Sequence, residues 1–179
     1  MAWKSFHHRG EILTAVIAAA DHRQDGILPM DVPGVAETFG DELTLLGALQ
    51  LRWHTRLAGR IERELMYQPM DLEQALITAW RATYEQMPGI RKIVDHYRSE
   101  PSDAAMAEAM RTATAKEQAM LAAMAGRASV QDAAAIRVGK AIEQRARAGV
   151  PNTVRRGSHR ADTRPYDGLL DRIKAVLAA

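Results

Sequence analysis

Apolar residues recur every three or four positions along most of this chain, and this spacing constrains its fold more than any other feature. Such spacing places them on one face of an α-helix, whereas a half-buried strand requires strict alternation of apolar and polar residues. The longest stripe consists of Phe39, Leu43, Leu46, Trp53, Leu57, Ile61 and Leu65. Because residues 1–148 contain no convincing alternating segment, the sequence predicts an all-α protein.

Proline, glycine and capping residues divide this pattern into about six helices. Gly40-Asp41 is a point at which the longest of them either breaks or restarts. The loops are short, which favours antiparallel neighbours in a helical bundle. The helices are expected near residues 8–23, 35–66, 72–87, 90–97, 101–125 and 129–148. We therefore expect a bundle domain over 1–148 and a separate C-terminal part over 149–179.

Short polar side chains mark several of the expected helix starts, because their oxygens accept hydrogen bonds from free backbone N–H groups. Asp31 is expected to cap the second helix and Asp71 the third. Pro101-Ser102 opens the alanine-rich helix. Ser129 together with Asp132 marks the start of the last helix of the bundle.

The last thirty residues combine a linker with a short amphipathic segment. Its apolar face is formed by Leu169, Leu170, Ile173, Val176 and Leu177. An isolated helix of fewer than about 12–15 residues is marginal in water, so this segment is expected to dock. The linker, 149–165, reaches about 20–25 Å as a flexible chain. That reach allows docking on its own bundle, on a second copy or in the groove of another protein.

Composition restricts the classes of protein that this chain can belong to. The 179 residues include no cysteine, which excludes disulfides, thiolate metal sites and thiol nucleophiles. No apolar run approaches the roughly 20 residues of a membrane span, and the N-terminus lacks the apolar core of a signal peptide. We therefore expect a cytoplasmic protein. Residues 150–179 carry six basic and three acidic residues, a net charge of +3, which leaves −1 for the rest of the chain.

An arginine row lies on the longest predicted helix and is a candidate anion-binding surface. Spacings of four, four and three residues place these arginines on one helical face, and guanidinium groups suit phosphates and carboxylates. The row consists of Arg52, Arg56, Arg60 and Arg63, which Arg155 and Arg156 of the linker would extend. The alternative is a solvated face neutralised by nearby acids. No nucleic-acid recognition motif accompanies the row, so nucleic-acid binding is possible without being favoured.

Methionines share one face of the alanine-rich helix, together with a glutamate. Methionine packs adaptably and occurs at promiscuous binding surfaces. The face consists of Met106, Met110, Glu117, Met120 and Met124. We interpret it either as a groove for an apolar ligand or helix, or as ordinary core with Glu117 at its edge. If Glu117 is buried, it needs a partner.

His54 is the histidine best placed for a ligand role, since it shares a helical face with apolar residues. It is a candidate ligand of a metal or haem, or a hydrogen-bonded core residue. No Glu-x-x-His motif of di-iron bundles occurs in the chain. The sequence therefore nominates no metal site and leaves any cofactor unknown.

No catalytic motif is present, neither a phosphate loop nor a Gly-x-Ser-x-Gly nor a His-Glu-x-x-His sequence. We therefore expect a non-enzymatic interaction or regulatory protein that acts through homo-oligomerisation or through its docked C-terminal helix. One alternative is a small-molecule or metal-binding bundle around His54 and the methionine face, with or without catalysis. Another is weak binding of nucleic acid by the arginine row and the basic linker.

Overall fold

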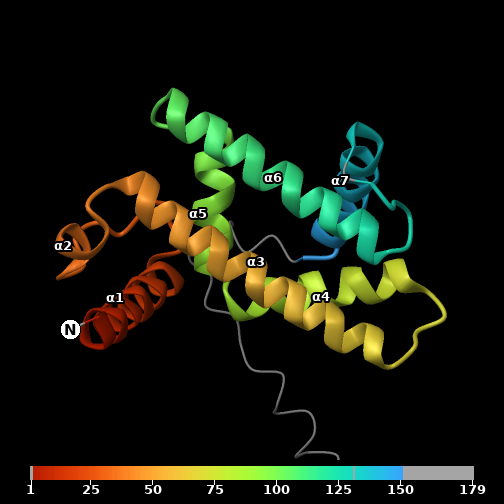
Figure 1. Cartoon of the computed structure of the whole chain (residues 1–179), viewed down its shortest axis with the longest axis horizontal. Coiled ribbons are helices and arrows are strands. Elements are labelled where there is room, and N and C mark those ends of the chain that lie inside the picture. The colour runs from red at the N-terminus through yellow and green to blue at the C-terminus, as the bar shows by residue number, and fades with distance from the viewer. Residues whose placement is uncertain (1, 131, 151–179) are drawn as a thin grey trace, which may run out of the picture.

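The computed structural model describes residues 2–130 and 132–150, and these form seven packed α-helices without a strand (Figure 1). The all-α prediction is therefore confirmed. In chain order the helices are α1 (Ala2–Arg23), α2 (Val35–Phe39), α3 (Glu42–Met66), α4 (Leu72–Gln86), α5 (Pro88–Ser99), α6 (Ala104–Met124) and α7 (Ala133–Ala148). None of these helices combines the length and the apolar character that crossing a membrane requires.

Aspartate side chains begin four of the helices. Asp71 accepts a hydrogen bond from Gln74 N at 3.0 Å, and Asp132 accepts one from Ala135 N at 2.8 Å. The predicted start of α4 is confirmed, whereas α7 begins at Ala133 with Asp132 as its cap and not at Ser129. The alanine-rich helix α6 is capped by Asp103 and not by Ser102, because the Asp103 carboxylate reaches the free N–H of the first turn.

The segment expected as one long helix over 35–66 is two helices. Gly40 has a φ of +78°, a conformation that ends α2, and Asp41 then caps α3. The expected cap at Asp31 is wrong. The Asp31 carboxylate instead pairs with Arg23 of α1 at 2.7 Å, and α2 begins after Gly34 without a side-chain cap.

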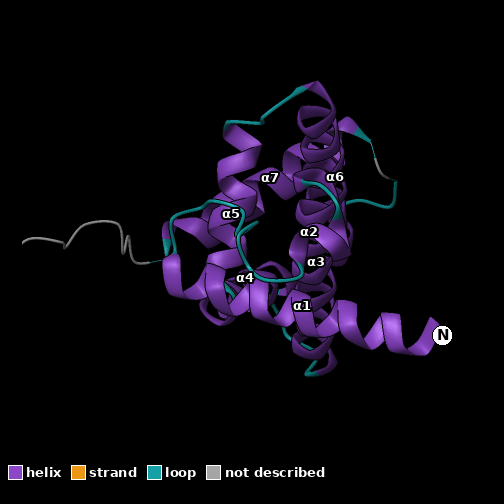
Figure 2. Ribbon diagram, turned by 90° about the vertical axis from the view of Figure 1, so that its left-hand side faces the viewer, coloured by secondary structure: helices purple, strands orange, loops and turns teal. Residues whose placement is uncertain are grey.

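Helix α5 lies at the centre of the molecule and contacts α1, α3, α4 and α6. Its buried apolar residues include Ile90, Ile93 and Val94. Figure 1 shows α3 and α6 running across the molecule with α5 passing between and behind them, and Figure 2 shows the same packing from the side. The core therefore surrounds α5, and the remaining helices each contribute one apolar face to it.

Two glycines bring helix backbones into direct contact. A Cβ atom placed on Gly89 of α5 would lie 2.3 Å from the backbone of Ala20 in α1. A Cβ atom on Gly139 of α7 would lie 1.7 Å from the carbonyl oxygen of Gln118 in α6. Because backbone atoms cannot move away as the end of a side chain can, both crossings require glycine.

Replacing Gly139 by alanine is therefore expected to separate α7 from α6 and to lower the free energy of unfolding by about 3 kcal/mol, at the upper end of the cost of overpacking. Chemical denaturation measures this loss. The matched control is Gly59→Ala in α3, where an added Cβ meets no atom within 4 Å. There the better helix propensity of alanine should raise stability by roughly 0.5–1 kcal/mol. Equal effects of the two substitutions would contradict the close crossing.

Candidate functional site

The methionine face of α6 is part of the protein interior. Met106 and Met110 are buried, and Met120 and Met124 are half-buried against the core. Glu117, on the same face, is only 3% exposed. These side chains pack against neighbouring helices. The buried Glu117 carboxylate therefore needs partners from those helices.

Glu117 is held by a cation and by an indole. Arg91 of α5, which is 1% exposed, donates from Nη1 to Glu117 Oε1 at 2.9 Å. Trp53 of α3 donates from Nε1 to Glu117 Oε2 at 3.1 Å. The Arg91 guanidinium also lies over the rings of Trp53 and Trp80, with 4.9 Å and 5.5 Å to the ring centroids. Each side of this buried cation thus faces a carboxylate or an electron-rich ring.

A second carboxylate, Glu143 of α7, extends the cluster. Its Oε1 accepts from Arg91 at 3.0 Å and from Arg98 at 2.9 Å, and its Oε2 accepts from the Gln118 amide at 3.0 Å. Arg147 donates to Glu143 as well. We call this set, with Asp95, the Arg91 cluster.

Asp95 completes the Arg91 cluster at its outer edge. Arg147 donates to both oxygens of Asp95 at 2.7 Å, and Arg91 donates to Asp95 at 3.0 Å. Burial alone would raise the pKa of the Asp95 carboxyl, but its bonds with Arg147 and Arg91 lower it. Three arginines therefore face three carboxylates, and the cluster is balanced in charge.

The sequence does contain a signal for this cluster, in the spacing of its charged residues. Arg91 and Asp95 are four residues apart, as are Glu143 and Arg147. Each pair lies on a helical face next to buried apolar residues, where a charged side chain needs a partner. A groove of about 420 Å³ opens beside the cluster, but it mixes acidic and basic groups: Asp95, Arg98, Lys140, Glu143 and Arg147.

His54 is half-buried on α3 and does not belong to the Arg91 cluster. Within residues 2–130 and 132–150, no group of three or more histidine, aspartate or glutamate side chains is arranged to hold a metal ion. His54 is therefore not part of a group of that size in this part of the chain.

The arginine row of α3 lines a surface groove of about 150 Å³. Arg56 Nε and Arg60 Nη2 both donate to Gln86 Oε1 of α4, at 3.0 and 3.1 Å. No ion pair joins any arginine of the row to an acidic residue within the described chain. The lining consists of Arg52, Thr55, Arg56, Gly59, Arg60 and Arg63. A neutral amide thus positions two guanidinium groups without cancelling their charge.

A second groove, of about 530 Å³, continues this surface between α3 and α1. The two grooves share Arg52 and Thr55. The second groove is lined in addition by Arg9, Leu13, Thr44, Gly47, Ala48 and Leu51. We call the first groove the arginine half and the second the apolar half of the α3 groove.

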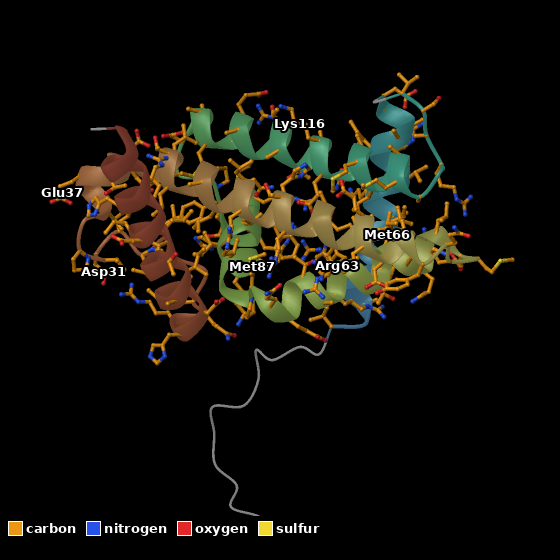
Figure 3. The ribbon with its side chains drawn as sticks, turned by 60° about the horizontal axis from the view of Figure 1, so that its bottom comes forward. Asp31, Glu37, Arg63, Met66, Met87 and Lys116 are labelled. Atoms are coloured by element: carbon orange, nitrogen blue, oxygen red, sulfur yellow. The ribbon has the colours of Figure 1, made fainter. Side chains whose placement is uncertain are left out.

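Figure 3 shows where several charged residues lie relative to α1 and α3. Arg63 lies towards the C-terminal end of α3, close to Met66, whereas Asp31 and Glu37 lie beside α1 at the other end. The α3 groove itself contains five arginines and no carboxylate among its lining residues. The ionisable side chains that line the α3 groove are therefore all positively charged.

Exposed apolar side chains gather at one tip of the molecule. Glu73 at the start of α4 pairs with Arg127 and Arg145, at 3.6 and 2.8 Å, which brings the α3–α4 turn beside the α6–α7 loop (Figure 1). We define the apolar tip as the exposed residues of these two connections: Met66, Tyr67, Met70, Leu72 and Val130. An exposed cluster of this kind is typical of a contact surface.

The remaining predicted site residues lie outside the described residues. These are Arg155 and Arg156 of the linker and the apolar face Leu169, Leu170, Ile173, Val176 and Leu177. Comparison of the chain with protein families, with curated proteins and with solved structures finds no match in any of the three. Function is therefore inferred from the geometry of the surfaces described above.

The Arg91 cluster predicts a specific loss of stability in acid. Burial alone would raise the pKa of Glu143, but the Arg91 charge, the Gln118 amide and Arg147 outweigh burial and lower the pKa to about 2 from 4.5. A carboxyl whose pKa is lowered by folding stabilises the protein above its unfolded pKa, and this contribution is lost as the pH falls from 4.5 towards 2.

The free energy of unfolding of the wild type should therefore fall more steeply over this interval than that of Glu143→Gln, which has no proton to gain. Urea denaturation at several pH values measures both profiles. Glu37→Gln, which changes an exposed carboxylate of α2, should follow the wild type. Parallel profiles of the wild type and Glu143→Gln would contradict the ionised state of Glu143 in the cluster.

Proposed function

We propose that this protein is a non-enzymatic helical interaction protein that recognises an acidic partner through the arginine half of the α3 groove. The observation that carries the proposal is a row of four arginines that share one groove and have no acidic partner within the described residues. Guanidinium groups present planar pairs of N–H donors that match carboxylates.

Preorganisation supports this role. Because Arg56 and Arg60 are both held by Gln86, part of their side-chain entropy is already lost before a ligand binds. Each keeps further N–H donors for an incoming carboxylate. The lining residues include no carboxylate or histidine that could act as a general acid or base, which favours binding over catalysis.

The Arg91 cluster supports the proposal by contrast. Its arginines are matched by an equal number of carboxylates, so it has no net charge with which to attract a ligand. We assign it the role of fixing the helices. The arginine row, which no such match neutralises, is left as the surface with charge available for a partner.

Self-association is a second candidate role, supported by the apolar tip. Methionine, tyrosine and arginine are enriched at protein interfaces, and Met66, Tyr67 and Met70 are each more than three-quarters exposed. The tip would meet either a second copy or the amphipathic C-terminal segment of a neighbouring chain. This role is compatible with an acidic partner, because the tip and the α3 groove use different residues.

The arginine half is tested with poly-L-glutamate as the probe and the full chain as the protein. Binding is expected to weaken as salt rises, because exposed charges are screened. Arg56→Gln/Arg60→Gln should weaken it at least about tenfold, since charge-assisted hydrogen bonds contribute roughly 1.5–3 kcal/mol each. Isothermal titration calorimetry measures the affinity.

The control Arg111→Gln/Arg137→Gln removes two exposed arginines of α6 and α7 and should change the affinity less than twofold. If both double variants lose affinity equally, net charge alone explains the binding, and the proposed site is contradicted. Tighter binding of a 20-nucleotide oligonucleotide than of poly-L-glutamate, lost in Arg56→Gln/Arg60→Gln, would assign the row to nucleic acid instead.

Self-association is tested by sedimentation of the full chain. The wild type should sediment as more than one subunit, and Tyr67→Glu/Met70→Glu should sediment as a monomer, because burying two charges in an apolar contact is costly. Leu51→Glu, which changes a 66% exposed apolar side chain of α3 outside the tip, is the control. If the C-terminal segment of a neighbour covers the tip, Leu170→Glu/Ile173→Glu should also yield monomers. A monomeric wild type would contradict this role.

A further inference from the structure

The arginine row continues into an apolar surface. A partner that covers both surfaces needs apolar groups as well as acidic ones. Leu51 is 66% exposed on α3, and Leu13 of α1 and Ala48 of α3 lie beside it in the apolar half of the groove. Arg52 and Thr55 line both halves, so the two form one trough along the outer face of α3. A ligand that has only charged groups would bind the arginine half and make no apolar contact in the other half.

The two glycines of α3 both lie on this trough. A Cβ atom added at Gly47 or Gly59 would meet no atom within 4 Å, so helix packing does not require glycine at either position. Glycine nevertheless weakens a helix relative to alanine. Because glycine has no side chain, Gly47 leaves space for a ligand in the apolar half and Gly59 leaves space in the arginine half.

The length of the trough matches a helix. From Thr44 to Arg63 the lining covers nineteen helical steps of α3, which is about 28 Å at 1.5 Å per residue. An amphipathic helix of about 19 residues, laid along α3, would therefore cover both halves. Its apolar residues would meet Leu13, Ala48 and Leu51 at one end, and its carboxylates would meet the arginine row at the other.

Arg9 adds a further donor at the apolar end. Its Nη1 donates to the carbonyl oxygen of Thr38 at 3.1 Å, and its guanidinium lies 4.5 Å from the centroid of the Phe39 ring. Helix α2 thus holds the Arg9 side chain in place at the groove. The apolar patch is consequently bounded by cations on both sides, and a matching helix carries acidic residues on both sides of its apolar anchor.

We propose that the α3 groove binds an acidic amphipathic helix of a partner protein, anchored by apolar side chains on Leu51 and by carboxylates on the arginine row. This inference rests on the proposed function for the arginine half and adds the apolar half as the determinant of specificity. The C-terminal segment of the chain itself is a poorer match, because residues 150–179 carry a net charge of +3. Nucleic acid is a poorer match because no aromatic side chain lines the trough to stack with bases.

The test uses two labelled synthetic peptides of about 19 residues, the length that spans the trough. Both carry the same number of glutamates. One has leucines on a single helical face, at positions i, i+3, i+4 and i+7, and the other has glutamine in place of each leucine. Fluorescence anisotropy with the full chain should show at least tenfold tighter binding of the leucine peptide.

Three variants separate the two halves of the groove. Leu51→Gln should remove most of the advantage of the leucine peptide, and Gly47→Gln, which places a side chain in the trough, should do the same by obstruction. Arg56→Gln/Arg60→Gln should weaken both peptides. Ile27→Gln, at an exposed isoleucine outside the groove, is the control and should change neither. Because Leu51 is exposed and Gly47 has open space above it, both variants should unfold at the temperature of the wild type or above it.

The outcomes distinguish this inference from the proposed function. If both peptides bind equally and only Arg56→Gln/Arg60→Gln weakens them, the arginine half binds an acidic partner and the apolar anchor is wrong. If neither peptide binds, or the arginine variant has no effect, both proposals are wrong. If Leu170→Glu/Ile173→Glu binds the leucine peptide more tightly than the wild type does, the C-terminal segment occupies the groove and the assignment to a partner protein is overturned.

Discussion

The buried guanidinium of Arg91 is the constraint on which the rest of the structure depends. An unpaired charge in a protein interior is costly, so a buried cation must be surrounded by groups that compensate for it. Here these groups come from four other helices: Trp53 of α3, Trp80 of α4, Glu117 of α6 and Glu143 of α7. The observed arrangement of the helices satisfies all of them at once. The ion pairs thus specify which helices meet α5 and in which rotation, while the apolar core supplies most of the stability.

The close crossing of α7 and α6 serves the same arrangement. Gly139 allows the α7 backbone to touch the carbonyl of Gln118, and Glu143 lies one helical turn further along α7. At that distance the Gln118 side chain reaches Glu143, and Glu143 reaches Arg91. A side chain at position 139 would push the helices apart and leave buried carboxylates without their partners. Backbone contact and charge pairing are therefore parts of one requirement.

The same helix that carries Trp53 into the interior carries the arginine row on its outer face. Trp53 is fully buried and hydrogen-bonded to Glu117, which sets the rotation of α3 about its own axis. Its rotation presents Arg52, Arg56 and their neighbours to the outside, where the neutral amide of Gln86 accepts hydrogen bonds from Arg56 and Arg60. Charge is thus balanced in the Arg91 cluster, whereas the arginine row has no acidic ion-pair partner among the described residues. The interior secures the geometry, and the surface retains the capacity to attract a partner.

The sequence by itself determined the local structure. The three-to-four-residue spacing predicted the helices, aspartate caps such as Asp71 placed helix starts, and the positions of the arginines placed them on one face, because each depends on residues within a turn or two of one another. Only the tertiary structure decided the partners of Glu117, since Arg91 and Trp53 are 26 and 64 residues away and meet it through helix crossings. The apolar half of the α3 groove was equally beyond the sequence, because Leu13 and Leu51 become neighbours only when α1 packs beside α3. Periodicity reports which face of a helix is apolar, whereas the identity of the neighbour depends on how all the helices pack together.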